Sequence, residues 1–317
     1  DVPCVFAQKT WIACETRCFK CRRMYRGVRE NMPINVSHLS YTYSKNGPFK
    51  KDALRDVSFD IDDGSFVGII GHTGSGKSTL IQHLNGLIKP DAGSVVIDGV
   101  NITEPGADMR KIRSKVGLVF QYPEYQLFEE TVYKDIAYGP SNLGMNFNAI
   151  DRLIHESIEF VGLGEDVLEK SPFELSGGQK RRVAIAGVLA MNPSILILDE
   201  PTAGLDPIGR RDILARLKTL HETKKITVML VSHSMEDIAA TVDKVIVMSN
   251  GRLAAFGTVP EIFSNSDLLK DAGLDVPQVC TVANVLRKDG FDISGDIYTV
   301  EKAADEIYNY IKGAKNA

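Results

Sequence analysis

The sequence predicts an α/β fold with a mixed core sheet, and three observations support this prediction. The apolar run Phe66–Ile70 leads into a glycine-rich loop and then into a helix-like segment. Four consecutive aliphatic residues, Ile195–Leu198, are typical of a strand that is buried on both faces, as in a parallel sheet. A helical segment, Pro207–Leu220, is followed by a third apolar run, Ile226–Val231, so that helices and strands alternate.

Composition and charge favour a globular protein with an ordinary core. The chain has 317 residues, of which 44% are hydrophobic and 25% are charged. No window approaches 18 consecutive apolar residues, so we expect the chain to work at a membrane only by docking on a partner. Beyond residue 30 there are 30 basic and 38 acidic residues, a net charge of −8, which disfavours binding to nucleic acid.

The first 31 residues differ from the rest of the chain. They contain Cys4, Cys14, Cys18 and Cys21, and the last three have a C-x₃-C-x₂-C spacing that could hold a metal or an iron–sulfur cluster, as in radical-SAM enzymes. No barrel-like run of βα units follows, so we expect residues 1–31 to be a disordered or non-native extension before Met32. The remainder has one cysteine, Cys280, which is typical of an intracellular protein without disulfides.

Three further regions are predicted around the core. Alternating strands at residues 34–43 and 54–61 predict an antiparallel β subdomain, in which Tyr41 or Tyr43 could either stack on a purine or pack in the core, and a further strand is predicted at residues 94–99. Residues 122–190 combine an aromatic-rich loop with apolar residues at helical spacing, which predicts an inserted helical subdomain. Beyond residue 260, apolar residues at helical spacing between Val300 and Ile311 predict an amphipathic helix, packed on its own domain or on a partner.

The loop after the first apolar strand has the GxxxxGKS pattern of a phosphate-binding loop. Its glycines let successive backbone N–H groups converge on phosphate oxygens, and the helix that follows adds its positive end. Lys77 is predicted to reach the β- and γ-phosphates of ATP, and the Ser78 hydroxyl to bind Mg²⁺. The predicted nucleotide-binding residues here are Gly71, His72, Thr73, Gly74, Ser75, Gly76, Lys77, Ser78 and Thr79.

Polar residues follow three other core strands. Asp199 and Glu200 come directly after Ile195–Leu198, and we predict that Asp199 holds Mg²⁺ while Glu200 deprotonates the attacking water. Gln121 follows the strand Lys115–Phe120 and could bind the metal and sense the γ-phosphate. His233 follows Ile226–Val231 and could bond the γ-phosphate, so that Glu200, His233 and Lys77 are the predicted catalytic residues.

A second anion site is predicted at the start of another helix, at Leu175–Gln179. Its residues are Ser176, Gly177, Gly178 and Gln179. A single γ-phosphate does not need two phosphate-binding sites from the same chain. We therefore expect two chains to pair head to tail, so that the signature of each chain closes the nucleotide site of the other.

These motifs resemble those of the ABC transporter ATPases, in order and without departures, over about residues 33–260. They are the Walker A loop Gly71–Ser78, the Q-loop residue Gln121, the signature Leu175–Gln179, the Walker B strand Ile195–Glu200, the D-loop Ala203–Asp206 and the H-loop His233. The stretch Phe120–Asp135, the pair His72-Thr73 and the C-terminal extension are similar to one subgroup, the ATP-binding subunits of energy-coupling factor (ECF) transporters, which import vitamins and transition-metal ions. The similarity is to the second, A-prime-like, ATPase subunit.

The resemblance implies an organisation and a set of partners. It implies a nucleotide-binding domain at residues 32–260, with the helical subdomain at about 122–190, and a small C-terminal α/β extension of the dimerisation type at 261–317. Tyr43 would stack on adenine, Asp206 would contact the nucleotide site, and the loop 122–138 would face a transmembrane energy-coupling subunit. A second ATPase, as a heterodimer rather than a homodimer, and a substrate-binding membrane component would complete a complex on the cytoplasmic face of the cell membrane.

Two alternatives follow from the same motifs. One is the ATPase of an ABC importer outside the ECF group. The other is a soluble ABC ATPase acting on ribosomes or DNA, which is disfavoured because the chain has one P-loop, no sustained heptads and an acidic body.

Overall fold

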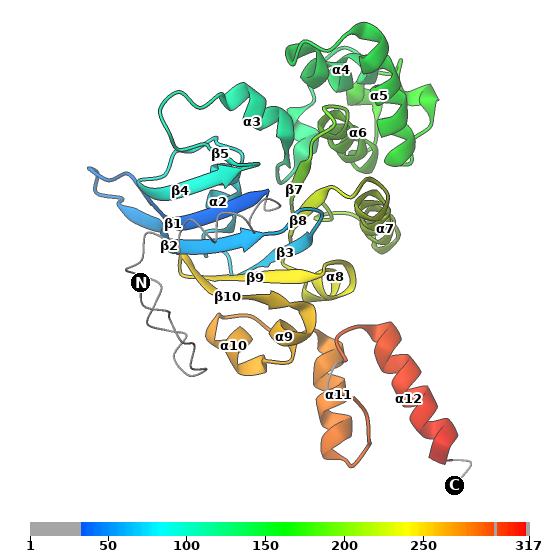
Figure 1. Ribbon diagram of the computed structural model, residues 1–317. Coiled ribbons are helices and arrows are strands. Elements are labelled where there is room, and N and C mark those ends of the chain that lie inside the picture. Colours follow the sequence, from blue (N-terminus) through cyan, green and yellow to red (C-terminus); the bar gives the residue numbers. More distant parts are fainter. Residues whose placement is uncertain (1–32, 295–296, 315–317) are drawn as a thin grey trace, which may run out of the picture.

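The computed structural model describes residues 33–294 and 297–314 (Figure 1). The predicted N-terminal extension, with Cys14, Cys18 and Cys21, lies outside the described residues. Within the described part of the chain, no helix combines the length and the apolar character needed to cross a bilayer.

The core is a six-stranded mixed sheet, as predicted. Its strands run in the order β10-β9-β3-β8-β7-β6. The five strands from β9 to β6 are parallel, whereas β10 pairs antiparallel with β9. The central strands are short and buried on both faces because most of their residues are apolar. The strands are β3 (Phe66–Ile70), β6 (Val116–Val119), β7 (Ile195–Asp199), β8 (Thr227–Val231), β9 (Lys244–Ser249) and β10 (Arg252–Thr258).

A second, antiparallel sheet lies against this core (Figure 1). It has the order β2-β1-β4-β5, which confirms the predicted antiparallel sheet. Its inward side chains, such as Ile34 and Ile97, form one buried cluster with Leu80 of the helix α2 and with Ile69 of the core sheet. The elements are β1 (Ile34–Tyr43), β2 (Lys51–Ile61), α2 (Lys77–Leu84), β4 (Ala92–Ile97) and β5 (Val100–Asn101).

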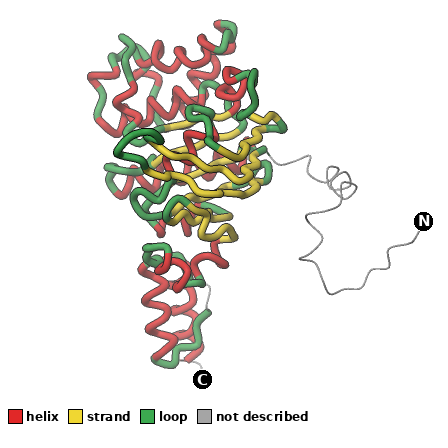
Figure 2. The backbone as a smooth tube through the Cα atoms, turned by 90° about the vertical axis from the view of Figure 1, so that its left-hand side faces the viewer, coloured by secondary structure: helices red, strands yellow, loops and turns green. Residues whose placement is uncertain are grey.

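Residues 122–190 form helices that gather at one end of the molecule (Figures 1 and 2). In α5, Ile150, Leu153, Ile154 and Ile158 repeat at helical spacing, and all four are buried. The Asn146 side chain begins this helix by accepting a hydrogen bond from the Ala149 amide. The elements are η1 (Pro123–Gln126), α4 (Val132–Asn142), α5 (Phe147–Phe160), η2 (Glu165–Val167), η3 (Pro172–Glu174) and α6 (Gly177–Leu189), preceded by α3 (Met109–Lys115).

The described part of residues 261–317 consists of helices and loops and contains no strand, so the predicted α/β character of this extension is wrong. Phe263 of α9 and Leu269 of α10 pack on the main core. By contrast, α11 and α12 project away from the sheets and share a small cluster that includes Ala283 and Ala303 (Figure 1). The remaining helices are α7 (Pro207–Lys224), α8 (Met235–Thr241), α9 (Val259–Phe263), α10 (Ser266–Asp271), α11 (Gln278–Lys288) and α12 (Val300–Ala314).

Candidate nucleotide-binding and catalytic site

The phosphate-binding loop connects β3 to α2 with a backbone that requires glycine. Gly76 precedes α2 with a φ of 105°, in the region that side chains disfavour. A Cβ atom at this position would lie 2.6 Å from the Ala53 carbonyl oxygen of β2. The loop therefore depends on the close approach of β2 as well as on its own sequence.

Replacing Gly76 with Ala is expected to abolish ATP binding and to lower the free energy of unfolding by about 1–3 kcal/mol, because the substitution combines a positive φ with a backbone clash. Thermal unfolding and titration with a fluorescent ATP analogue check both effects. Gly47→Ala is the matched control, since the nearest atom to its added Cβ is 3.6 Å away. Normal ATP binding by the Gly76 variant would contradict the assignment of this loop.

Lys77 is held at the centre of this loop. Its Nζ donates hydrogen bonds to the carbonyl oxygens of Gly71 at 2.6 Å and His72 at 3.2 Å. Burial lowers the pKa of the Lys77 amine, and the nearby carboxylates of Glu200 and Asp199 oppose this shift. The ammonium is therefore placed between the loop and the acidic residues of β7, where a phosphate would meet it.

A pocket of about 140 Å³ opens beside the loop, and Tyr43 lines it together with Gly74, Gly76, Lys77, Ser78 and Thr79. The Tyr43 hydroxyl lies 3.4 Å from Thr79 Oγ1. Tyr41, in contrast, packs on the buried cluster between the two sheets and meets the His83 ring edge-on. The structure thus separates the two tyrosines: Tyr41 packs in the core and Tyr43 lies at the pocket.

Asp199 ends β7 next to the start of α2. The Ser78 hydroxyl donates a hydrogen bond to its carboxylate. Burial raises the pKa of Asp199, and the bond from Ser78 and the charge of Lys77 oppose this shift. A hydroxyl and a carboxylate in contact are oxygen ligands that suit Mg²⁺, so these residues fit the metal that ATP carries.

Glu200 is the adjacent carboxylate and has an unusual backbone. Its φ is 53°, and its amide donates to the Val231 carbonyl oxygen of the neighbouring strand at 3.0 Å. Burial, followed by the charge of Asp199, raises its pKa to about 7, against the opposing effects of Lys77 and the His233 amide. Its Oε1 is buried, lies 3.4 Å from His233 Nε2, and has no hydrogen-bond partner in residues 33–294 and 297–314. Such a carboxyl is suited to general-base work near neutral pH.

The raised pKa predicts how Glu200 affects stability. Between its ordinary pKa of 4.5 and about 7, the folded chain holds a proton that the unfolded chain releases, so this group makes stability fall as pH rises through that window. Glu200→Gln is therefore expected to be more stable than the parent by about 1–2 kcal/mol above pH 7, after discounting for solvent screening.

At pH 4.5 the two proteins should be equally stable. Urea unfolding across the pH range, with EDTA and without nucleotide, measures the difference. A difference that does not change between pH 4.5 and 8 would contradict the raised pKa.

Two further predicted site residues, His233 and Gln121, differ in how closely they contact the acidic residues of β7. His233 follows β8 and touches Glu200, and burial followed by the charge of Lys77 lowers its pKa, which favours the neutral ring at pH 7. Gln121 is exposed, two residues after the end of β6, the neighbour of β7. It therefore lies at the same edge of the sheet, but the structure gives it no contact with Ser78 or Asp199.

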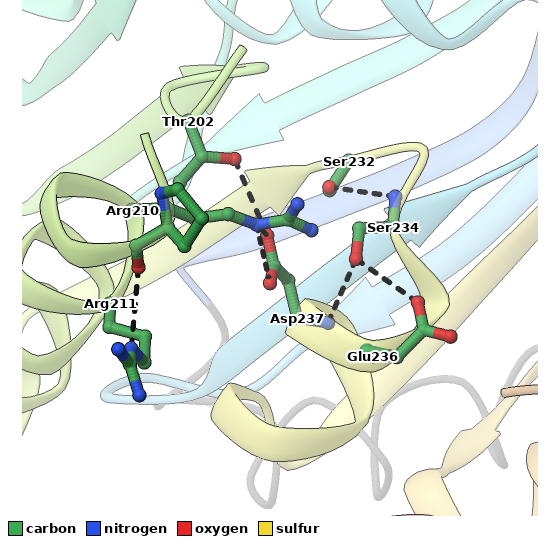
Figure 3. Close-up of polar contacts among 8 residues, drawn as sticks. Thr202, Arg210, Arg211, Ser232, Ser234, Glu236 and Asp237 are labelled. Atoms are coloured by element: carbon green, nitrogen blue, oxygen red, sulfur yellow. Dashed lines mark hydrogen bonds and ion pairs between the residues drawn. The ribbon is translucent and has the colours of Figure 1, made fainter. Parts of the chain in front are cut away.

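The loops around His233 and Asp206 are tied to each other by a polar network (Figure 3). Arg210 of α7 donates from Nε to both carboxylate oxygens of Asp237 in α8, at 2.9 and 2.7 Å. Thr202 bonds the same carboxylate at 3.3 Å, and the Asp237 amide donates to Ser234. The segments that follow Glu200 and His233 are therefore held together.

The predicted signature residues lie apart from the P-loop. Ser176 begins α6 with a capping box, in which its hydroxyl accepts from the Gln179 amide and Gln179 Oε1 accepts from the Ser176 amide. Gly177 and Gly178 form the first turn of α6, which packs on α4 and α5, whereas α2 packs on β2 and β4. Asp206 caps α7 by accepting from the Gly209 amide at 2.7 Å. The chain therefore does not bring Ser176, Gly177 or Asp206 to its own phosphate loop.

Sequence reasoning missed three features of this site. Lys51 lines the nucleotide pocket, Asp237 links the two loops, and Glu200 has a positive φ. A charged residue in a strand or on a helix carries no sequence signal that distinguishes it from a solvated side chain. The position of Asp237, one helical turn after His233, is the nearest available signal.

This site combines a P-loop between a parallel strand and a helix, two acidic residues after a second strand, and a histidine after a third. Together these features define an ATPase of the ABC transporter class. In agreement, the ABC transporter family model matches residues 54–203.

Individual relatives narrow this class. The chain is 55% identical over 285 residues to the energy-coupling factor transporter ATP-binding protein EcfA2 of Caldanaerobacter subterraneus subsp. tengcongensis, covering 90% of this chain and 100% of that protein. It is 57% identical to EcfA2 of Clostridioides difficile, covering 89% and 99%. The chain therefore belongs to the family of energy-coupling factor transporter ATP-binding proteins.

Solved structures agree with the ABC transporter class. CbiO1 of Clostridium perfringens, described as part of the ABC transporter complex cbiONQ, superposes with a TM-score of 0.68 and 34% identity over 81% of this chain and all of that chain. The dimeric ATP-binding cassette MJ0796, bound to ADP and Pi, superposes with a TM-score of 0.65 and 31% identity over 71% and 98% of the two chains.

Proposed function

We propose that this chain binds Mg²⁺-ATP in one half of a shared site and hydrolyses it to power an ECF-type importer. One observation carries the proposal. The phosphate loop and the helix start at Ser176 are both accessible, and they do not meet within the chain. A second ATPase subunit would bring its own signature to Lys77 and would receive Ser176 at its own nucleotide.

Each site residue has a specific task in this proposal. Tyr43 stacks on adenine, and the loop residues Gly71–Thr79 hold the phosphates. Ser78 and Asp199, with Gln121, hold Mg²⁺, which supplies charge neutralisation at the phosphate oxygens when bound. Glu200 accepts the proton of the attacking water, and the neutral His233 ring holds the water and the γ-phosphate in line. Lys77 stabilises the charge that develops on the transferred phosphoryl group.

The C-terminal helices supply a surface for the second ATPase. In α11, Val282 and Val285 are each 52% exposed, and in α12, Tyr308 and Ile311 are also exposed. Apolar side chains at helical spacing on two adjacent helices favour contact with another helical surface. This supports a dimerisation role for residues 261–317, and the family resemblance favours a heterodimer over a homodimer.

A groove in the helical subdomain fits a membrane partner. A cavity of about 500 Å³ lies between α4, α6 and the loop before α4, with Leu127, Phe128, Tyr138, Val183 and Met191 among its lining residues. Phe128 and Tyr138 are exposed and meet edge to face at 4.9 Å. The groove presents apolar and aromatic surface that an intracellular helix of the transmembrane energy-coupling subunit would cover. This subunit would hold the chain on the cytoplasmic face of the membrane.

In this proposal the cargo, vitamins or transition-metal ions, is chosen by a separate substrate-binding membrane component. Affinity purification from detergent-solubilised membranes, through a tag on this chain, tests the assembly. We expect a second ATPase and two integral membrane proteins to co-purify. Recovery of this chain without any partner would contradict the ECF assembly. So would its recovery with one type of ATPase and the subunits of an importer that uses a periplasmic binding protein.

A further inference from the structure

Arg181, in the second turn of α6, is almost fully buried and bonded through every nitrogen of its guanidinium group. Its Nε and Nη2 donate to the two carboxylate oxygens of Glu124 at 3.1 and 2.9 Å. Its Nη1 donates to the carbonyl oxygen of Ala203. The Arg181 side chain is 4% exposed and that of Glu124 is 17% exposed, so this is a bidentate ion pair shielded from water.

The three partners come from segments that are distant in the sequence. Glu124 belongs to η1, three residues after Gln121, and η1 leads into the aromatic loop of the proposed membrane contact. Ala203 lies between Glu200 and Asp206. Arg181 itself follows the signature residues on α6. The guanidinium also lies 5.9 Å from the centre of the Tyr122 ring.

We propose that Arg181 is a positioning residue that fixes the Gln121 loop and the Ala203–Asp206 loop against the signature helix, so that the three move as one unit. The proposal deepens the proposed function, because it assigns the connection between the membrane contact and both halves of the nucleotide site. A guanidinium is a rigid planar fork that binds both Glu124 carboxylate oxygens at once, and the Arg181 side chain is 4% exposed, so the pair is held in one geometry. A displacement of η1 therefore has to displace Ala203 or break the ion pair.

Three variants separate this role from general stabilisation. Arg181→Met removes all three bonds. Arg181→Lys keeps the charge beside Glu124 but lacks the planar fork whose separate nitrogens reach Glu124 and Ala203, so we expect it to lose the bond to Ala203. Arg216→Gln is the matched control, since Arg216 likewise pairs with a carboxylate, Asp212, and donates to a carbonyl, that of Phe160, but it joins α7 to α5 away from both loops.

Hydrogen–deuterium exchange of the isolated full-length chain measures the connection directly. Arg181→Met should raise exchange in both residues 121–126 and residues 200–206, whereas Arg181→Lys should raise it chiefly in residues 200–206. Arg216→Gln should raise it only around residues 160–164. A rise in one loop or in neither for Arg181→Met would overturn the proposal, and Arg181→Lys supplies the comparison if the Met variant does not fold.

ATP hydrolysis by the assembled complex measures the consequence. We expect Arg181→Met to lower kcat by about 10- to 100-fold, because small displacements of reacting groups have effects of this size. KM for ATP should stay within about twofold, and Arg216→Gln should keep the parental kcat. Equal kcat values for the parent and Arg181→Met, or an equal loss in Arg216→Gln, would overturn the positioning role. An inactive parental complex would instead contradict the proposed function, and the exchange measurement would still decide the connection between the loops.

Discussion

Replacing Glu200 with Gln is expected to lower ATP turnover by about 10²–10⁴-fold while ATP binding is retained, as is usual when a general base is lost. Glu200 is buried next to Asp199, and its raised pKa of about 7 makes it a proton acceptor at neutral pH. Its Oε1 faces His233 Nε2 at 3.4 Å. Gln has the same shape but cannot accept the proton of water, so the nucleotide should stay bound and intact.

Steady-state hydrolysis and the ATP retained after gel filtration measure the two effects on the complex purified through this chain. Glu165→Gln is the matched control, since Glu165 is exposed and pairs with His155 in the helical subdomain. Parental turnover in Glu200→Gln would show that another group takes the proton.

Gly177→Asp is expected to abolish hydrolysis by the assembled complex without harming the fold of the chain. Gly177 is the first residue of α6, it is exposed, and a Cβ atom built there meets no atom within 4 Å. A carboxylate in the first turn also favours a helix by about 0.3–1 kcal/mol. In the assembled site, however, the amide of residue 177 would face the γ-phosphate of a nucleotide bound to another chain. The added carboxylate would repel this phosphate, so we expect turnover to fall at least about 100-fold.

Thermal unfolding and hydrolysis by the complex, measured side by side, test this expectation. Ser266→Asp is the control, because it adds the same charge at the first residue of α10, away from the site. A complex that carries Gly177→Asp and keeps parental turnover would contradict the proposed position of the signature.

The fold could be predicted where the sequence has long and regular apolar patterns. The strands from Phe66 to Ile70 and from Ile195 to Asp199 are buried along their whole length, so their sequences are almost entirely apolar. The helix predicted between Val300 and Ile311 is present as α12, whereas the first part of the C-terminal extension lacks such a pattern, because α9 and α10 have five and six residues and depend on Phe263 and Leu269 packing against the main core. Short helices of this kind are stabilised by tertiary contacts, which a local pattern does not show.

The sequence predicts only those residues of the site that belong to recognisable motifs. Lys77, Ser78, Asp199 and Glu200 lie together, as their spacing in the sequence indicates. The ion pair between Arg181 and Glu124 could not be predicted, since two residues that are 57 positions apart meet only after the sheet and the helices have packed. In the sequence, such residues look the same as charges on a solvated face.

In the proposed function, the nucleotide site in this chain is half of a site, completed by the signature of another chain. The affinity of the isolated chain for a fluorescent ATP analogue tests it most directly. We predict that Gly177→Asp binds as tightly as the parent, whereas Lys77→Ala, which removes a charged donor, binds at least about tenfold more weakly. If Gly177→Asp weakened binding by the isolated chain as much as Lys77→Ala does, the signature would act on its own nucleotide and the claim would be wrong.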